Sequence, residues 1–452
     1  MRPSSSDVWF ISYLPLALSD GISGPLIPLL ALALFRPSAL VVAAVIAASS
    51  LSEVPFTILW GNLSDRVQHR RYFLVGSFLA TGATLLAMPF ATTFGEYFLI
   101  NVVNGLATAA SAPIGTMLLL ETRAKRWWPR DIGLFGLISG VGTVLGLLLG
   151  FVWLGLFSSA GPLSLGVVAA MRYLLLVAGS LSILSGITAW AWVEEPSLRL
   201  NRRSISELLN LEKGVVERVR GFRRRVLHIV ELARGAPDPL PRVEWAFLAA
   251  LFVMSIGFQV FYGPFVFYLS SPAAGGLDQT QVTFVFLTSA VASTALFYHS
   301  GLAVEYTSPK WVFIGSLLAR VALIPLFLDS VGLLHGDPFA LTLALAGLNG
   351  AMGVTWAFLS TASTLFLVRL VGVTNKGKAL GLYNALAGFG GLAGTLLGGW
   401  LYIGLGATWT YEVAAGVVLL GALMFLPISY RRTLFPSVSL PVKGRARRPG
   451  SG

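Results

Sequence analysis

The stretch Gly61-Asn62-Leu63-Ser64-Asp65-Arg66-Val67-Gln68-His69-Arg70-Arg71 interrupts a chain that is otherwise mostly apolar. It lies between two apolar stretches, 38–60 and 72–92, and each is long enough to cross a bilayer core about 30 Å thick as a helix. A short acidic and basic loop of this kind is expected at the aqueous face of a membrane. There it can hold charge pairs and helix ends together in one conformational state and release them in another.

The composition predicts that lipid, rather than water, surrounds most of this chain. Of its 452 residues, 55% are hydrophobic and only 12% are charged, and the mean hydropathy is +0.77. A soluble protein usually carries about 25% charged residues. Apolar stretches of about 18 residues or more recur along nearly the whole chain, and each is a candidate membrane-spanning helix.

Twelve stretches reach the length of about 20 residues that a helix needs to cross the bilayer. The predicted spans are 8–35, 38–60, 72–92, 96–120, 131–157, 168–193, 244–270, 277–300, 310–329, 338–368, 378–404 and 407–430. The first is too long for a signal-peptide core and lacks a clear cleavage site, so we interpret it as a span. The order of six spans, a gap and six more predicts an all-α polytopic membrane protein with twelve transmembrane helices.

The basic residues predict which side of the membrane each loop faces, because cytoplasmic loops retain Lys and Arg. Of 32 Lys and Arg residues, only Arg36 and Arg172 fall on the predicted outside, and Arg320 falls within a span. Both termini are therefore predicted to be cytoplasmic, in the cell membrane. The net charge of +12 is explained by orientation and by anionic lipid headgroups, so we expect membrane lipids, and no nucleic acid, as partners.

The spans and gaps predict four regions. Residues 1–193 form an N-terminal six-helix bundle and residues 244–432 a C-terminal one. Residues 194–243 form a cytoplasmic linker in which 205–234 has the spacing of a basic amphipathic helix lying at the lipid interface. Residues 433–452 are expected to be a disordered, basic cytoplasmic tail.

The two halves share internal repeats in the same order, which indicates a parallel duplication of a six-helix unit. Gly24-Pro25 in the first span matches Gly263-Pro264 in the seventh, and Asn104-Gly105 matches Asn349-Gly350. Small residues spaced by four let helix backbones approach closely in lipid, either for static packing or for sliding. The repeated glycines, at one constant offset, are Gly133, Gly140, Gly142, Gly146 and Gly150 in the fifth span and Gly381, Gly388, Gly390, Gly394 and Gly398 in the eleventh.

The loop quoted first resembles the loop signature of the major facilitator superfamily, which reads Gly, any residue, Leu, small, Asp, Arg, a short gap and two basic residues. A degenerate second copy, with Gly301, Glu305 and Lys310, stands in the matching loop of the other half. The resemblance implies two pseudo-symmetric six-helix bundles and a conformational latch between them. It assigns the latch to these residues: Gly61, Asp65, Arg66 and Arg70. Orientation alone explains the arginines, but neither the glycine nor the aspartate.

Other features of that family are absent. The fourth span carries Asn101 where many proton-coupled members have an arginine, and Gly146 is followed by Leu147 where many drug/proton antiporters have proline. These departures weaken a proton relay of that type and the antiporter interpretation. They leave the architecture that the resemblance implies unaffected.

Polar residues within spans are the candidates for function, because each one is expensive to insert into lipid. If the halves pack as in the resembled family, the first, fourth, seventh and tenth spans line a central cavity. The solute or ion candidates are then Asp20, Asn101, Asn104, Gln259, Tyr262, Asn349, Thr355 and Trp356. The competing interpretation is that the amides hydrogen-bond between helices and serve packing only.

Two carboxyl groups are candidates for ion coupling. A carboxyl group removed from water favours its protonated form, so Asp20 or Glu53 can exchange a proton as water access alternates. Asp20 can equally bind Na⁺ or a cationic solute. Arg320 has no evident partner in its own span, and the sequence leaves its role open.

The sequence offers little for catalysis. Cysteine is absent, the four histidines lack metal-ligand spacing, and neither a phosphate-binding loop nor a Ser-His-Asp pattern occurs. We therefore expect no enzyme activity, no metal and no cofactor. The predicted function is secondary active transport of a small solute by alternating access, with export of an amphipathic or weakly cationic compound favoured slightly over uptake of a sugar-like neutral solute. A non-transporting membrane sensor and a lipid-handling membrane enzyme are the other classes.

Overall fold

The computed structural model describes residues 9–35, 38–67, 70–111, 114–115, 118, 128–158, 165–193, 242–272, 276–334, 336–370 and 376–428. These residues are nearly all helical. In chain order the helices are η1 (Trp9–Ser12), α2 (Tyr13–Leu34), α3 (Ala39–Val67), α4 (Arg70–Ala87), η2 (Met88–Phe90), α5 (Phe94–Thr108), α7 (Trp128–Phe157), α8 (Val167–Trp192), α11 (Arg242–Tyr262), α12 (Phe265–Ser270), α13 (Gln279–Tyr306), α14 (Pro309–Leu334), α15 (Pro338–Leu370) and α16 (Lys376–Phe425).

Ten helical stretches of the described residues are long and apolar enough to cross a membrane. One of them, Leu382–Phe425, is 44 residues long and contains Gly406, whose φ of +81° breaks the helix. This break separates the predicted spans 378–404 and 407–430. Helix α5, with 15 residues, occupies the position of the fourth predicted span. The all-α polytopic fold predicted from the sequence is thus confirmed.

Two helices begin with a side-chain motif that satisfies their first backbone N–H groups. Before α5, the Thr93 side chain accepts a hydrogen bond from the Glu96 backbone N–H at 3.2 Å, and the Glu96 carboxylate accepts one from the Thr93 N–H at 3.3 Å. Before α13, Asp278 and Gln281 make the same reciprocal pair. Such capping boxes set where a helix starts after a loop.

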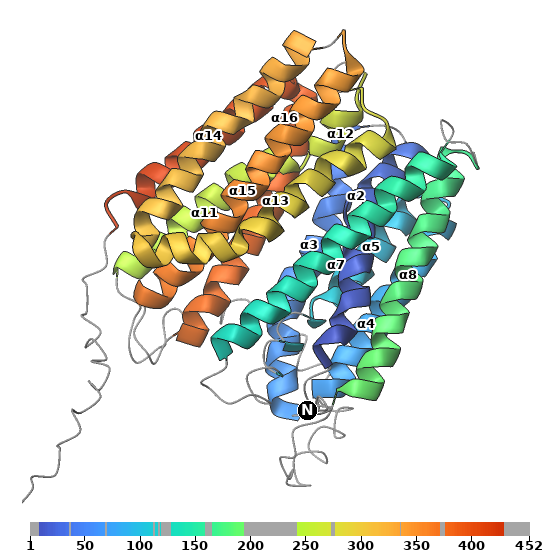
Figure 1. Ribbon diagram of the computed structural model, residues 1–452, viewed down its shortest axis with the longest axis horizontal. Helices are drawn as coiled ribbons and strands as arrows, with labels where there is room; N and C mark the ends of the chain where they lie inside the picture. The colour runs from blue at the N-terminus through green and yellow to red at the C-terminus, as the bar shows by residue number, and fades with distance from the viewer. Residues whose placement is uncertain are drawn as a thin grey trace, which may run out of the picture.

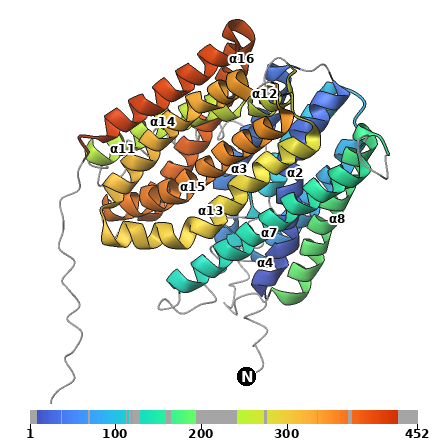
Figure 2. The same ribbon diagram turned by 45° about the horizontal axis from the view of Figure 1, so that its top comes forward.

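The helices form two groups that follow the chain (Figure 1). Helices α2 to α8 pack on one another, and α11 to α16 pack on one another. The groups meet where α7 lies along α13 and where α3 lies along α16, with α12 against α2 and α3. Figure 2 shows the same division after rotation. The exact boundaries at residues 193 and 244 stay a prediction, and the predicted linker helix and basic tail lie outside the described residues.

The halves approach closely near one end of the bundle. A Cβ atom built on Gly399 of α16 would lie 2.5 Å from the Ala43 Cβ atom near the start of α3. A Cβ atom on Gly155, at the end of α7, would lie 3.6 Å from the Thr280 Cγ2 atom at the start of α13. This end contains the last turn of α7 and the first turns of α3 and α13, so it is the end predicted to face away from the cytoplasm.

The structure corrects the register of one internal repeat. The Asn101 side chain on α5 donates a hydrogen bond to the Val45 carbonyl of α3, and Asn349 on α15 donates one to the Val285 carbonyl of α13 at 2.8 Å. Asn101, rather than Asn104, is therefore the counterpart of Asn349. The sequence pairing was misled because an Asn-Gly dipeptide recurs three residues out of register.

The repeated glycines permit close backbone contact between helices. On α16, a Cβ atom at Gly390 would lie 2.8 Å from the Phe252 carbonyl oxygen of α11, and one at Gly398 would lie 2.5 Å from the Val260 carbonyl oxygen. Gly394, between them, would overlap the Ile256 carbonyl oxygen. In the other half, Gly146 of α7 stands in the same relation to Leu18 of α2. These stripes let the fifth and eleventh spans pack tightly on the first and seventh.

Substituting Gly394 by leucine is expected to destabilise the protein by about 3 kcal/mol, because the new side chain has no space against the α11 backbone. Gly416→Leu is the matched control on the same helix, since nothing lies within 4 Å of a Cβ atom there. Its expected change is within about 0.5 kcal/mol. Unfolding titrations in detergent measure both changes, and equal stability of the two variants would contradict the packing account.

Within each half, a basic side chain at the start of one helix binds a backbone carbonyl at the end of another. At the start of α4, the Arg71 guanidinium donates a hydrogen bond to the Trp190 carbonyl near the end of α8 and lies 4.4 Å from the Trp190 ring centroid. At the start of α14, the Lys310 ammonium donates to the Leu426 carbonyl after α16 at 2.6 Å. A cation at a helix C-terminus satisfies free carbonyls and the helix dipole.

Candidate solute site

A cavity of about 340 Å³ lies inside the C-terminal half. It is lined by helices α11, α13, α14, α15 and α16 and is partly open, since the Trp356 side chain is 46% exposed. Its polar lining consists of Ser255, Gln259, Tyr262, Ser289, Arg320, Trp356 and Tyr383, and its apolar lining of Leu251, Met254, Phe258, Met352, Leu359, Ala387 and Gly391. The volume falls within the range of about 300 to 1,000 Å³ that is typical of small-molecule sites.

Two helix faces supply most of this lining. On α11, Phe258, Gln259 and Tyr262 lie within about one turn, and on α15 Met352 and Trp356 are spaced by four. Residues three or four apart in a helix share a face, so each helix presents its group toward the same space. Gln259, Tyr262 and Trp356, which the sequence predicts as solute-site candidates, therefore line the same cavity.

Arg320 reaches the cavity from α14. Its side chain is only 3% exposed. Its Nε donates a hydrogen bond to the Thr355 hydroxyl at 3.0 Å, and its Nη2 donates one to the Met352 carbonyl at 3.1 Å. These two hydrogen bonds, both to α15, fix the guanidinium group at the cavity wall. Thr355, another predicted residue, therefore contributes to the site through Arg320.

Aromatic rings flank the guanidinium group. Its central carbon lies 4.6 Å from the Phe258 ring centroid and 5.6 Å from that of Trp356. Tyr262 is close enough for electrostatic interaction with Arg320. Cation–π attraction within about 6 Å strengthens when water is excluded, so these rings stabilise a charge that the apolar surroundings oppose.

Gln259 is an uncharged polar group on the α11 wall, in the last turn of that helix. Its side-chain oxygen accepts a hydrogen bond from the Thr395 hydroxyl of α16 at 3.2 Å. That contact orients the amide, and its NH₂ group has no hydrogen-bond partner among the described residues. Gln259 can therefore donate hydrogen bonds to a bound solute.

The three asparagines do not line this cavity. Asn101 and Asn349 are almost fully buried and hydrogen-bond to carbonyls of the neighbouring helix. Asn104 accepts a hydrogen bond from the Thr84 hydroxyl at 2.7 Å. These contacts are of the interhelical kind that serves packing in membranes. The Oδ1 atom of Asn349 is buried without a hydrogen-bond partner in the described part of the chain.

The two candidate carboxylates lie in the N-terminal half, apart from the cavity lining. Asp20 is in the middle of α2 and Glu53 is on α3, and they are close enough to interact electrostatically. Both side chains are exposed. Helix α2 contacts α3, α7 and α8 of its own half and α12 and α13 of the other half.

The predicted latch is only partly described. Residues 61–67 continue α3 and α4 begins at Arg70, so the interhelical loop is shorter than the sequence suggested. At Gly61, Asp65, Arg66 and Glu305 the structure describes the helical backbone only. The Arg70 side chain is buried, with 6% exposure, and is not free of contacts. The latch stays a prediction.

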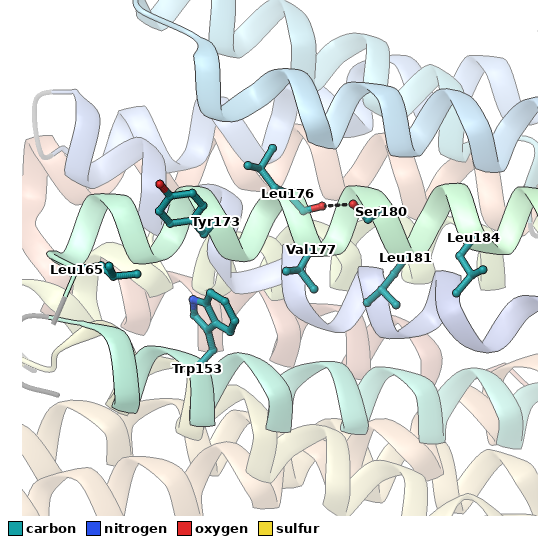
Figure 3. A pocket seen from close by; sticks show the side chains of 8 residues that line it. All are labelled: Trp153, Leu165, Tyr173, Leu176, Val177, Ser180, Leu181 and Leu184. Atoms are coloured by element: carbon teal, nitrogen blue, oxygen red, sulfur yellow. Dashed lines mark hydrogen bonds between the residues drawn. The ribbon is translucent and has the colours of Figure 1, made fainter. Parts of the chain in front are cut away.

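A larger cavity, of about 650 Å³, lies between α7 and α8 (Figure 3). Trp153 of α7 faces Tyr173, Val177 and Leu181 of α8 across it. The Ser180 hydroxyl in its lining already donates to the Leu176 carbonyl at 2.8 Å, and Tyr173 supplies a second hydroxyl. With exposed Leu165, Tyr173 and Leu184 in its lining, it is a mostly apolar groove that opens to the surface of the helical group.

A family model described as Major Facilitator Superfamily matches this chain twice, over residues 9–275 and residues 273–444. The chain belongs to the Major Facilitator Superfamily. The two matches together cover both helical groups. Proteins of this superfamily are transporters, and the chain is a multi-pass membrane protein.

Solved structures of superfamily transporters share the fold. The nucleoside transporter NupG aligns with a TM-score of 0.65 at 16% identity, covering 94% of this chain and 98% of the other. The inward-open xylose transporter XylE from E. coli aligns with a TM-score of 0.66 at 14% identity, covering 94% and 96%. A D-xylose-proton symporter aligns with a TM-score of 0.67 at 14% identity, covering 94% and 97%. No curated protein sequence gives a significant match.

The sequence singled out Arg320 as a charge within a span but did not predict that it lines a cavity. Its signal was a lone charge in the middle of an apolar span, which marks functional positions in membranes. Serine and tyrosine residues of the lining, such as Ser255, Ser289 and Tyr383, carried no such signal. Hydroxyl-bearing residues are common in spans, and their orientation follows from packing alone.

Proposed function

We propose that this protein is a secondary active transporter that moves a small organic solute across the cytoplasmic membrane by alternating access. Both termini lie in the cytoplasm in this proposal, and the two six-helix halves rock about a solute held in the C-terminal cavity. The observation that carries this proposal is the cavity itself, whose wall includes Arg320 from the middle of α14 and Gln259 and Tyr262 from the last turn of α11.

The closed end of the bundle supports the rocking motion. Close contacts of α7 with α13 and of α3 with α16 hold the halves together at the end carrying Gly155, Thr280 and Gly399. With cytoplasmic termini, that end is the outer face, and the molecule faces inward. The loop with Gly61, Asp65, Arg66 and Arg70 then serves as the latch that forms when the cytoplasmic ends close.

Proton coupling is the proposed source of energy. Asp20 and Glu53 lie near each other on α2 and α3, exposed although they are within the apolar part of the N-terminal half. A carboxylate pair in such surroundings can take up a proton on one side and release it on the other. One structural neighbour, with the same fold, is named a D-xylose-proton symporter. We therefore propose symport with protons and retain Na⁺ only as the alternative ion.

Counterflow in proteoliposomes tests the proposed function. Vesicles are loaded with unlabelled D-xylose, uridine or benzoate, and uptake of the labelled form is followed. At least one solute is expected to show a transient overshoot that empty vesicles lack. Trp356→Ala should raise its half-saturating concentration roughly fivefold or more by removing a cavity ring. Trp400→Ala, an exposed residue outside the cavity, should leave it unchanged.

A different outcome would favour a different function. If correctly folded protein supports no counterflow for any of these solutes and no proton movement on adding them, transport is excluded for these classes. The fold would then serve a membrane sensor, the remaining alternative from the sequence.

A further inference from the structure

Arg320 carries a positive charge that the described residues do not neutralise. Its side chain is 3% exposed, and among the described residues its contacts are with Thr355, Met352 and the rings of Phe258 and Trp356, with no Asp or Glu in a salt bridge. A buried charge without a counter-charge is strongly unfavourable in a membrane-embedded helix. A bound anionic solute would supply the opposite charge.

The guanidinium group still has a donor to offer. Nε and Nη2 are bonded to α15, whereas Nη1 has no hydrogen bond among the described residues. Nη1 is also not one of the fully buried, unbonded atoms, so it is reached from the cavity that Arg320 lines. A guanidinium N–H group makes short, charge-assisted hydrogen bonds to an anionic oxygen such as that of a carboxylate or a phosphate.

The surroundings of this donor are apolar and aromatic. Phe258 and Trp356 flank the guanidinium group, and Leu251, Met254 and Leu359 complete the wall on either side. A small inorganic anion would leave these side chains without a partner. An organic acid would place its carboxylate at Nη1 and its hydrocarbon body against the rings.

We propose that the cavity binds a small organic monocarboxylate with an aromatic or apolar body, and that Arg320 holds its carboxylate. This inference rests on the proposed transport function and names the substrate class of the same cavity. It replaces the weakly cationic solute expected from the sequence, because Arg320 would repel a cation. A neutral sugar would leave the charge of Arg320 without an opposite charge.

Matched pairs of probes isolate the role of charge. Benzoate and benzamide, 2-naphthoate and 2-naphthamide, and indole-3-acetate and indole-3-acetamide differ within each pair mainly in the carboxylate. Binding to purified full-length protein is measured by calorimetry at neutral pH. At least one acid is expected to bind about tenfold or more tightly than its amide.

Substitutions of Arg320 test whether the preference for the acid over the amide depends on this residue. Arg320→Gln should abolish the preference for the acid, and Arg320→Lys should retain part of it. Arg172→Gln is the matched control, because Arg172 is exposed near the start of α8, far along the chain from the cavity helices. Size-exclusion profiles and thermal midpoints verify folding. If Arg320→Gln does not fold, the acid and amide pairs on the native protein decide the question.

Three results would overturn the proposal. They are equal binding of acid and amide in all pairs, an unchanged preference in folded Arg320→Gln, and displacement of the acids by equal concentrations of chloride or phosphate. None of these results bears on transport itself, since counterflow of a neutral solute would survive them. Conversely, acid binding that depends on Arg320 in a protein without counterflow would refute the proposed function and retain the subsite.

Discussion

Proteoliposomes containing Asp20→Asn are expected to lose accumulation driven by a pH gradient while keeping counterflow of the same solute. Asparagine has nearly the same shape as aspartate but cannot take up a proton. The solute path therefore stays intact and its link to the gradient is broken. With one proton per solute, a gradient of one pH unit supports up to about tenfold accumulation, which should fall to the equilibrium level in the variant.

Two further variants make this result specific. Asp329→Asn changes an exposed aspartate of α14 in the same way and should leave accumulation unchanged. Glu53→Gln removes the neighbouring carboxylate and should weaken accumulation without abolishing it, since Asp20 remains. Full accumulation in Asp20→Asn together with its loss in Glu53→Gln would assign proton exchange to Glu53 instead.

Most of the fold followed from the sequence because lipid imposes simple requirements on length and polarity. The break between the last two spans was predicted within a single apolar run, and Gly406 lies at that break. The end of one helix was predicted less accurately. Residues 61–67 carry charges typical of a loop, yet α3 continues through them, because helical backbone tolerates charged side chains at an aqueous surface.

The internal repeat was detected correctly, but its register in the fourth and tenth spans was wrong. The sequence shows that an Asn-Gly dipeptide occurs in both spans, but it does not show which asparagines make the equivalent interhelical hydrogen bond. The contacts of Asn101 with Val45 and of Asn349 with Val285 provide that information. The corrected register also agrees with the offset of the glycine stripes in the fifth and eleventh spans.

The candidate site was predicted in part. Gln259, Tyr262 and Trp356 line one cavity, whereas the asparagines bond between helices and Asp20 lies in the other half. Periodicity indicates which residues share a face but not which face meets a cavity. Arg320 illustrates this limit, because an arginine in a span can extend toward lipid headgroups or turn inward, and only the packing of α14 on α15 decides between them.

Rocking of the two halves predicts that joining them at their closed end stops transport. The chain contains no cysteine, so an engineered pair forms the only possible disulfide. Gly155→Cys with Thr280→Cys joins α7 to α13, where a Cβ atom on Gly155 would lie 3.6 Å from the Thr280 Cγ2 atom. The Thr280 Cγ2 atom lies one bond beyond its Cβ atom, in a position that a cysteine Sγ atom can take, so this contact brings the pair close to the Cβ separation of about 3.5 to 4.5 Å that a disulfide needs. Ser300→Cys with Thr361→Cys is the control within one half, since those hydroxyls are 2.8 Å apart.

The most direct test of alternating access is counterflow by the Gly155→Cys/Thr280→Cys protein before and after oxidation. Oxidation is expected to reduce counterflow to the level of empty vesicles, and a reductant should restore it, while the Ser300→Cys/Thr361→Cys control transports in both states. Undiminished counterflow by fully cross-linked protein would show that the halves need not separate at this end, and would contradict the mechanism.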